Sequence, residues 1–210
     1  KIITSSLTFT LKVLLDLYEK IPNLELCVIQ SECLEHEAFK DPNGFYMLLL
    51  KRAAFVFDWS PSNISELKKK LGKESIGLYC WEFECPKDLT PWDKRTIDLA
   101  FIGSRSKGRQ ELLKRIATNY PSIVFFVDLN YAYTSKDKLD SILGSTKFVL
   151  NLPYYKNAPL ATHRINKATI MGCRVISLRS HDRELDDMYE DYVHFAESEE
   201  SYLKAILCLI

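Results

Sequence analysis

The chain has 210 residues, with 28 Lys and Arg against 28 Asp and Glu, so its formal net charge is zero and no global field favours nucleic acid or an anionic membrane. Its hydrophobic share of 47% is ordinary for a globular protein that can bury one large or two small cores, and no apolar run is long enough to span a bilayer. Any anion-binding site must therefore be a local arrangement of charges.

Short apolar runs alternate with amphipathic segments along the chain, and this alternation predicts an α/β fold with parallel sheets covered by helices on both faces. Helices are predicted over residues 62–72, which Gly72 ends, and over 107–120. Nine runs are predicted to be strands: residues 1–5, 25–31, 54–60, 75–81, 97–104, 122–129, 147–153, 174–178 and 192–196.

The polar stretch 82-EFECPKDLTPWDKR-95 carries two prolines and interrupts the alternation. We therefore predict two Rossmann-like domains, residues 1–92 and 93–210, that face each other across a cleft. In sheets of this kind, ligands bind at the carboxyl ends of the strands. Polar residues that follow a strand are accordingly the first candidates for a binding site.

The stretch 157-NAPLATHRINKATIMG-172 has the pattern of a helix, because Asn157 can cap it, Pro159 fits its first turn and Gly172 can end it. The β-branched run that follows predicts a buried strand. Arg164 and Lys167 are three residues apart, so they share one face of this helix. Two cations placed in this way could meet an anionic ligand.

The strand predicted to end at Ser104 leads into 105-RSKGRQELL-113. Gly103, Ser104, Arg105 and Arg109 therefore stand at a strand-to-helix turn, where free N–H groups and the helix dipole favour anions. The alternative is a solvated turn with scattered basic residues, and the chain has no GxGxxG or Walker motif. A second strand end, 150-LNLPYY-155, offers Asn151, Tyr154 and Tyr155 beside the helix that carries Arg164.

The six cysteines match no zinc-binding spacing, and we interpret all of them as reduced and structural. Reduced thiols favour the cytoplasm, and the first residues have no signal-peptide layout. The chain does not begin with Met, which is compatible with its being one part of a longer multidomain protein. Few carboxylates stand near the predicted loops, and Asp186 and Asp187 are expected on a surface helix, so no metal is expected.

A set of short motifs runs in order through the second half of the chain: 101-FIGS-104, Arg109, 150-LN-151, 164-RIN-166, 175-VIS-177, 186-DDMY-189 and 193-VHF-195. With these motifs, the segment from about Thr96 to Tyr202 resembles the C-terminal domain of GT-B glycosyltransferases. More narrowly, it resembles a group found in bacteria and large DNA viruses, including chloroviruses. The N-terminal half is similar through 30-QSE-32 and 58-DWSPSNI-64, and its short length implies a compact version of the fold.

The resemblance implies an enzyme that transfers a hexosyl or deoxyhexosyl group from a nucleoside-diphosphate sugar to a glycan or another hydroxyl acceptor. The C-terminal domain would hold the donor, and Arg109 and Arg164 would meet its diphosphate, whose negative charge grows in the transition state. His163 could hydrogen-bond a phosphate or the sugar, although a lone histidine is more often structural. No metal or other cofactor is implied, and the enzyme would work in the cytoplasm, or in the host cytoplasm if it is viral.

The chain departs from the group at three positions, because Ala161, Lys167 and Leu178 stand where glutamates are common. The glutamate at the second position usually holds the donor ribose, and a lysine cannot accept a hydrogen bond. Either the ribose is held differently, or the donor sits differently, or the site has lost activity. Lys167 could instead be a second phosphate ligand or a solvated helix lysine.

An inverting reaction needs a general base, which the N-terminal domain would supply. Glu32 ranks first because the resemblance places it at a strand end, with an N-cap or a loop salt bridge as the structural alternative. His36 ranks second because its ordinary pKa lies near neutrality, and Asp58, Glu35 and Glu37 are further candidates. A retaining mechanism can do without such a base.

Two functions from different classes remain open. The first is a nucleotide-sugar glycosyltransferase. The second is a catalytically degenerate domain of the same fold that binds a sugar, a nucleotide or a partner protein. A regulatory nucleotide-binding domain is a weaker third, since it would not require the ordered C-terminal motifs. The sequence names neither the base nor the sugar of a donor.

Overall fold

The computed structural model describes residues 2–4, 13, 16–17, 19–21, 23–41, 43–130 and 134–210. The chain folds into two compact units, residues 1–80 with 157–159 and residues 81–156 with 160–210. The structural division falls at residues 80 and 81, whereas the domain boundary predicted at residues 92 and 93 stays a prediction.

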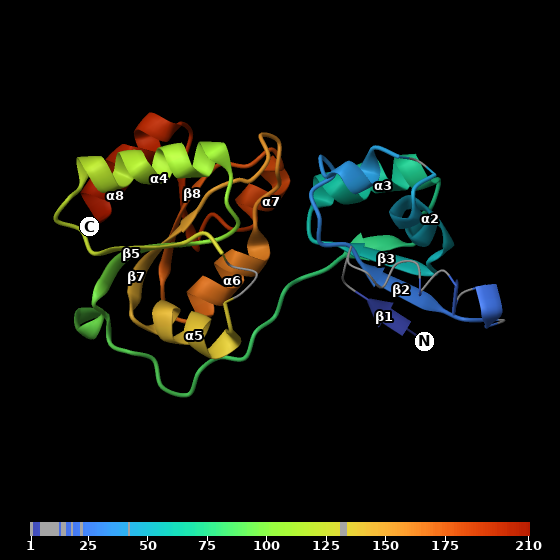
Figure 1. Cartoon of the computed structure of the whole chain (residues 1–210), viewed down its shortest axis with the longest axis horizontal. Coiled ribbons are helices and arrows are strands. Elements are labelled where there is room, and N and C mark those ends of the chain that lie inside the picture. Colours follow the sequence, from blue (N-terminus) through green and yellow to red (C-terminus); the bar gives the residue numbers. More distant parts are fainter. Residues whose placement is uncertain are drawn as a thin grey trace. The chain divides into compact units, whose positions relative to one another are not determined.

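The first unit is built around a parallel sheet of four strands in the order β1-β2-β3-β4. Helices α2 and α3 cover one face of this sheet, where their leucines pack against strand residues such as Val28 and Val56 (Figure 1). Its elements are β1 (Ile2–Thr4), β2 (Leu26–Ile29), the 3₁₀ helix η1 (Glu37–Phe39), α2 (Phe45–Arg52), β3 (Phe55–Asp58), α3 (Pro61–Leu71) and β4 (Ile76–Leu78).

The second unit is built around a parallel sheet of five strands in the order β6-β5-β7-β8-β9. Helices α4 and α8 lie on one face of the sheet, and α5 and α6 lie on the other (Figure 1). Its elements are η2 (Trp92–Lys94), β5 (Ile97–Ile102), α4 (Lys107–Asn119), β6 (Phe125–Asp128), α5 (Lys136–Gly144), β7 (Thr146–Asn151), α6 (Thr162–Ile170), β8 (Arg174–Leu178), α7 (Arg183–Asp187), β9 (Val193–Ala196) and α8 (Glu199–Leu209).

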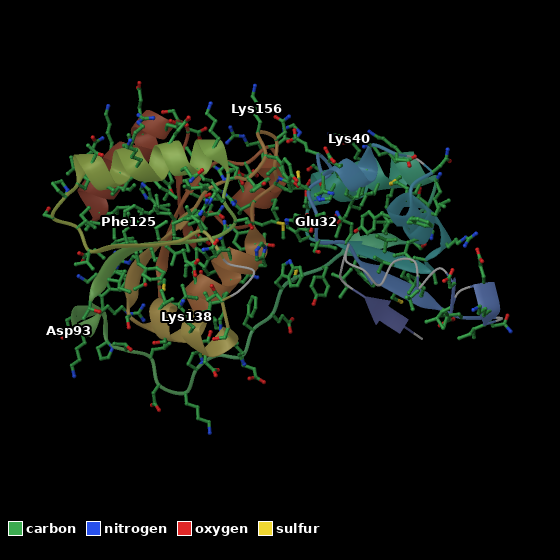
Figure 2. The ribbon with its side chains drawn as sticks, in the orientation of Figure 1. Glu32, Lys40, Asp93, Phe125, Lys138 and Lys156 are labelled. Atoms are coloured by element: carbon green, nitrogen blue, oxygen red, sulfur yellow. The ribbon has the colours of Figure 1, made fainter. Side chains whose placement is uncertain are left out.

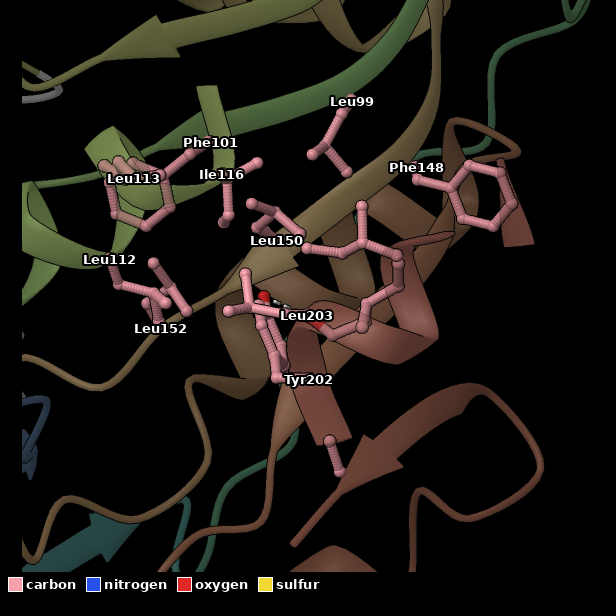
Figure 3. Close-up of a cluster of buried hydrophobic side chains, with 13 residues drawn as sticks. Leu99, Phe101, Leu112, Leu113, Ile116, Phe148, Leu150, Leu152, Tyr202 and Leu203 are labelled. Atoms are coloured by element: carbon pink, nitrogen blue, oxygen red, sulfur yellow. Dashed lines mark hydrogen bonds between the residues drawn. The ribbon is translucent and has the colours of Figure 1, made fainter. Parts of the chain in front are cut away.

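Alternation along the strands of the second sheet decides which side chains meet which helices. Phe101 and Leu150 point into the core formed with α4 and α8, which Figure 3 shows together with Tyr202. The Tyr202 hydroxyl is fully buried and donates to the Ile176 carbonyl at 3.2 Å, so the largest residue of this core has its polar atom satisfied. The neighbours of Phe101 and Leu150 along the strands, Ile102 and Val149, face α5 and α6.

The prediction of an α/β fold with parallel sheets is confirmed, and each predicted run overlaps one strand of the described residues, although β7 begins at Thr146, one residue before its predicted run. The ends of the predicted run 1–5 lie outside the described residues. The prediction of α3 is also confirmed, since Ser60 caps it and Gly72 ends it in the left-handed region at φ 61°.

The predicted start of helix α6, at Asn157 and Pro159, is wrong. Helix α6 begins at Thr162 with Ala161 as its N-cap, so Asn157 and Pro159 lie before it. Leu160 is buried, and burial of this leucine outweighs the local start signals. The predicted surface position of Asp186 is also wrong. Asp186 is fully buried in α7 and accepts a hydrogen bond from the Ser180 N–H at 2.7 Å.

Candidate functional site

The carboxyl ends of β5 and β7 are neighbours at the point where the chain changes direction across the sheet. Leu99 pairs with Phe148 and Ala100 with Val149, so the two strands run side by side to their ends. From β5 the chain crosses to β6 through α4, on one face, and it returns past β5 to β7 through α5, on the other (Figure 1). Ligands of open α/β sheets bind outside the strand ends at such a point.

Arg164, in the first turn of α6, ties these two strand ends together. Its Nε donates to the Ile102 carbonyl at 3.0 Å, and its Nη1 donates to Asn151 Oδ1 at 2.6 Å. Asn151 is buried and donates in turn to Ser177 Oγ at 3.0 Å, which carries the network to the end of β8. The guanidinium is therefore held in place before any ligand arrives.

Arg109, in the first turn of α4, bridges the residues that follow the same two strands. Its Nε and Nη2 donate to the Leu152 carbonyl at 3.1 and 2.6 Å, and its Nη1 donates to the Ser104 carbonyl at 2.8 Å. The guanidinium carbon lies 5.2 Å from the centre of the Tyr154 ring. Arg109 forms no ion pair among the residues that the structure describes.

The two guanidiniums share the Phe101 ring, whose centre lies 5.4 Å from Arg109 and 5.6 Å from Arg164. Burial, and then repulsion from Arg164, lowers the pKa of Arg109 to about 10. Burial and mutual repulsion thus destabilise the two positive charges, and an anion bound beside them would relieve this repulsion.

Gly103 lets the chain pass close to these groups. A Cβ added at this position would lie 3.0 Å from Arg164 Nη2 and 3.0 Å from the Phe101 ring. A side chain here would displace the guanidinium, so the glycine of the FIGS motif serves a close approach.

Two features mark the start of α6 as a candidate ligand site. Ala161 provides no capping side chain for the first N–H groups of the helix. The Thr162 hydroxyl is buried and has no hydrogen-bond partner among the described residues. Buried polar groups are usually paired, so this hydroxyl points to a ligand or a water molecule.

His163 is half-buried beside the two arginines. Burial, and then the charges of Arg164 and Arg109, lowers the pKa of His163 to about 4. The imidazole is therefore neutral at pH 7 and can offer one hydrogen-bond donor and one acceptor.

This pKa predicts a pH-dependent stability. In the unfolded chain His163 titrates near 6.5, so the unfolded state binds more protons than the folded state between about pH 6.5 and 4. The contribution of this group is complete above pH 6.5 and is lost as the pH falls towards 4, by about 3 kcal/mol in total. The free energy of unfolding of the unmodified chain should therefore fall more steeply over this range than that of His163→Gln. His194→Gln is the control, because His194 is exposed. Parallel curves for the unmodified chain and His163→Gln would contradict the assignment.

Lys167 is neither a solvated lysine nor an unpaired cation. Its Nζ lies 2.6 Å from Asp140 Oδ1 on α5, and its side chain is only 12% exposed. The ammonium also lies 5.7 Å from the centre of the Phe83 ring. A role as a phosphate ligand stays a prediction, and Lys167 would share its charge between a ligand and Asp140.

The remaining donor-side residues lie around the same strand ends. Ser104 and Arg105 are exposed, and Ser106 rather than Ser104 caps α4. Tyr154 is 46% exposed and packs edge-on against Tyr155 at 4.8 Å between ring centres. Seven of the predicted donor-side residues therefore lie around the carboxyl ends of β5 and β7: Gly103, Ser104, Arg109, Asn151, Tyr154, His163 and Arg164. Arg105 is an exposed side chain beside them.

A pocket of about 410 Å³ opens between α5, α6 and the sheet. Arg164 and Lys167 both contribute to its walls, which confirms that these two cations share one face of the helix. Its apolar walls come from Phe83, Ile102, Leu139, Leu143 and Val149, and its other polar groups are Thr134, Lys136 and His163.

In the first unit, Glu32 follows β2 and is half-buried (Figure 2). Burial raises the pKa of its carboxyl, and His36 lowers it by a smaller amount. Its backbone is held by the fully buried Gln30, which accepts from the Glu32 N–H and donates to the Glu32 carbonyl at 2.6 Å. A carboxyl with a raised pKa on a fixed backbone has properties that suit a general base.

The other two proposed bases have structural partners. His36 caps η1, because its Nδ1 accepts from the Ala38 N–H at 3.1 Å, so the proton of the neutral ring is on Nε2. Asp58 is fully buried and accepts from Gln30 at 2.7 Å and from the Ser60 N–H at 2.9 Å. Burial raises its pKa to about 7. An acceptor hydroxyl could reach Asp58 only by breaking these bonds, so Asp58 ranks last.

Sequence reasoning missed several residues that hold the site. Gln30 carried the necessary signal as an amide beside Glu32 in 30-QSE-32. Phe101, Ser177 and Asp140 carried none, because their roles depend on partners that lie far away in the sequence.

The residues that the structure describes form neither a metal site nor a helix that spans a membrane. No three His, Cys, Asp or Glu side chains among them come together as a metal site would require. None of their helices combines the length and apolar character needed to cross a bilayer.

No protein-family model and no curated protein matches the sequence. The fold is similar to the crystal structure of TarM, a glycosyltransferase of the GT-B type, with a TM-score of 0.61 and 12% sequence identity. The comparison covers 99% of this chain and 47% of TarM, so the chain spans about half the length of that protein. The chain therefore has an α/β fold like that of TarM.

Proposed function

We propose that the chain is a glycosyltransferase that moves a sugar from a nucleoside-diphosphate sugar to a hydroxyl acceptor such as a glycan. The observation that carries the proposal is the pair of arginines, Arg109 and Arg164, fixed at the carboxyl ends of β5 and β7. The likeness to TarM supports the fold in which such a site would work.

The chemistry follows from the charge that develops during transfer. When the bond between the sugar and the β-phosphate breaks, the diphosphate leaves with added negative charge, and fixed cations stabilise it without reorganising. Arg109 and Arg164 would supply this charge. The Thr162 and Arg164 N–H groups already donate to the Leu160 and Ala161 carbonyls, so α6 would add mainly the positive end of its dipole. Neutral His163 would bind a phosphate or sugar oxygen without adding a third charge.

In this proposal the protein is a compact GT-B enzyme. Residues 1–92 would serve the acceptor and residues 93–210 would hold the donor. The cleft between the domains, the cytoplasmic location and the likeness to viral and bacterial enzymes stay predictions.

One observation favours a second candidate, a degenerate domain that binds a nucleotide or sugar without catalysis. Lys167 stands where the related enzymes are expected to hold the donor ribose, and it is paired with Asp140 rather than open to a hydroxyl. If this pair excludes the ribose, the fold and the arginines could persist without turnover.

Donor hydrolysis tests the two candidates. Incubation with UDP-, GDP- and dTDP-sugars without added acceptor should release free sugar and the nucleoside diphosphate, which chromatography detects. Binding of nucleotides by calorimetry without any release, across donors and plausible acceptors, would favour the degenerate domain. Absence of nucleotide binding would reject the glycosyltransferase and would leave the degenerate domain only as a sugar-binding one.

The same assay tests the expected independence from metal. Release should survive EDTA, because no group of carboxylates in the described ranges is placed to hold a divalent ion against the phosphates. Release that is lost on chelation and restored by Mn²⁺ would contradict this expectation and require a different site.

A further inference from the structure

The pocket between α5 and α6 has the size and the lining of a site for a flat organic ring. Its volume of about 410 Å³ lies within the range of small-ligand sites. Val149, Leu143 and Ile102 are almost fully buried and form an apolar wall, while the Phe83 ring is part of the same lining. Such walls are too apolar for a phosphate alone, but they can pack against the faces of a nucleobase.

The pocket is continuous with the proposed phosphate site, because Arg164 belongs to both. The guanidinium of Arg164 forms part of the pocket wall and bridges the ends of β5 and β7. A donor whose diphosphate meets Arg164 would therefore have its nucleoside within reach of this pocket.

The polar groups of the pocket are strongly biased towards hydrogen-bond donors. Lys136 and Lys167 carry ammonium groups, which donate and never accept. Thr134 donates its hydroxyl proton to Asp128 Oδ2 at 2.6 Å, so towards the pocket it can only accept. Neutral His163 can provide one donor and one acceptor.

Nucleobases differ in how well they match this set. The bases differ at C4 of the pyrimidines and C6 of the purines. There uracil, thymine and guanine carry a carbonyl beside a ring N–H, whereas cytosine and adenine carry an amino group beside a bare ring nitrogen. A carbonyl can accept from a lysine ammonium, and the ring N–H can donate to Thr134 or His163. An amino group set against an ammonium would be left unpaired, which disfavours its burial.

We propose that this pocket receives the base of the donor, and that Lys136 and Lys167 select keto bases (uracil, thymine or guanine) over amino bases (cytosine or adenine). The proposal rests on the proposed function, which fixes only that the donor is a nucleotide. The Asp140 ion pair uses part of the Lys167 ammonium and holds it at the wall, which leaves N–H groups for a carbonyl oxygen.

Calorimetric titration with two matched pairs, UDP against CDP and GDP against ADP, tests the selection. The keto member of each pair should bind at least about tenfold more tightly, as expected for one charge-assisted hydrogen bond. Lys136→Met and Lys167→Met should each reduce this ratio, and the double variant should bring it close to one. Lys138→Met is the matched control, because Lys138 lies exposed on the same helix outside the pocket (Figure 2) and should leave the ratio unchanged.

Three results would overturn the proposal while leaving the proposed function standing: equal affinities within each pair, tighter binding of CDP or ADP, or a ratio that survives both Met substitutions. No binding of any of the four nucleotides would overturn the proposed function along with it. Lys136→Met keeps the test informative if Lys167→Met fails to fold, because Lys136 is exposed at the start of α5.

Discussion

Arg164→Ala is expected to weaken the binding of a nucleoside diphosphate by at least about tenfold. A charge-assisted hydrogen bond to a ligand contributes about 1.5–3 kcal/mol, and about 1.4 kcal/mol corresponds to a factor of ten. Arg164 is fixed by Ile102 and Asn151 before the ligand arrives, so little ordering cost offsets this contribution. Calorimetry on the purified variant measures the loss directly.

The same contacts mean that the substitution also acts on the fold. The Asn151 amide oxygen and the Ile102 carbonyl would lose their donor, which should lower the free energy of unfolding by about 1–3 kcal/mol. Affinity must therefore be measured well below the unfolding midpoint of the variant.

Two further variants separate charge from geometry in this experiment. Arg164→Lys keeps the charge but loses the planar fork that reaches two acceptors, so it should recover only part of the affinity. Arg115→Ala is the control, because Arg115 is an arginine on α4 whose partner is the exposed Glu199. Unchanged nucleotide affinity in Arg164→Ala would remove Arg164 from the site.

The fold could be predicted because strands buried in parallel sheets have a local signature. They appear as short β-branched and aromatic runs between amphipathic helices, and each of the nine runs overlaps a strand. The start of α6 was mispredicted for the opposite reason, since burial of Leu160 is a tertiary effect that the capping signals of Asn157 and Pro159 do not contain.

The site could be predicted in part, because residue type and position at a strand end are visible in a sequence. The positions of Arg109 and Arg164 at these strand ends could be predicted in this way, and their role in binding stays a prediction. Their partners could not be predicted, since Arg109 bonds to a backbone carbonyl 43 residues away. The strand order β6-β5-β7, which places the two arginines at one edge and creates the pocket, is likewise absent from any local pattern.

The structure narrows the two roles that the sequence leaves open for Lys167. From the sequence it was either a phosphate ligand or a solvated lysine. The structure pairs it with Asp140, so a carboxylate lies beside the pocket between α5 and α6 although residue 167 is a cation. This part of the second unit therefore keeps a negative charge without the glutamate that the resembling enzymes commonly have at this position.

Glu32→Gln is expected to lower kcat by about 10²–10⁴-fold if the enzyme inverts the sugar, while the affinity for the donor stays nearly unchanged. The substitution keeps the size of the side chain and removes the group that would take the proton from the acceptor hydroxyl. Burial raises the pKa of Glu32, so the acid limb of the kcat/KM profile should lie above the ordinary range of a glutamate. Gln30 holds the Glu32 backbone in both variants, so a loss of rate would report on the carboxylate rather than on the loop.

Two matched variants test whether the effect belongs to Glu32. Glu37→Gln removes an exposed carboxylate in the same loop region and should leave kcat unchanged. His36→Asn removes the imidazole, and asparagine can still cap η1, so its effect should be mild if Glu32 is the base and severe if His36 is. A Glu32→Gln variant with near-normal kcat would exclude Glu32. Together with a mild His36→Asn, it would leave Asp58 or Glu35 as the base, or a retaining mechanism in which the leaving diphosphate held by Arg109 and Arg164 takes the proton from the acceptor.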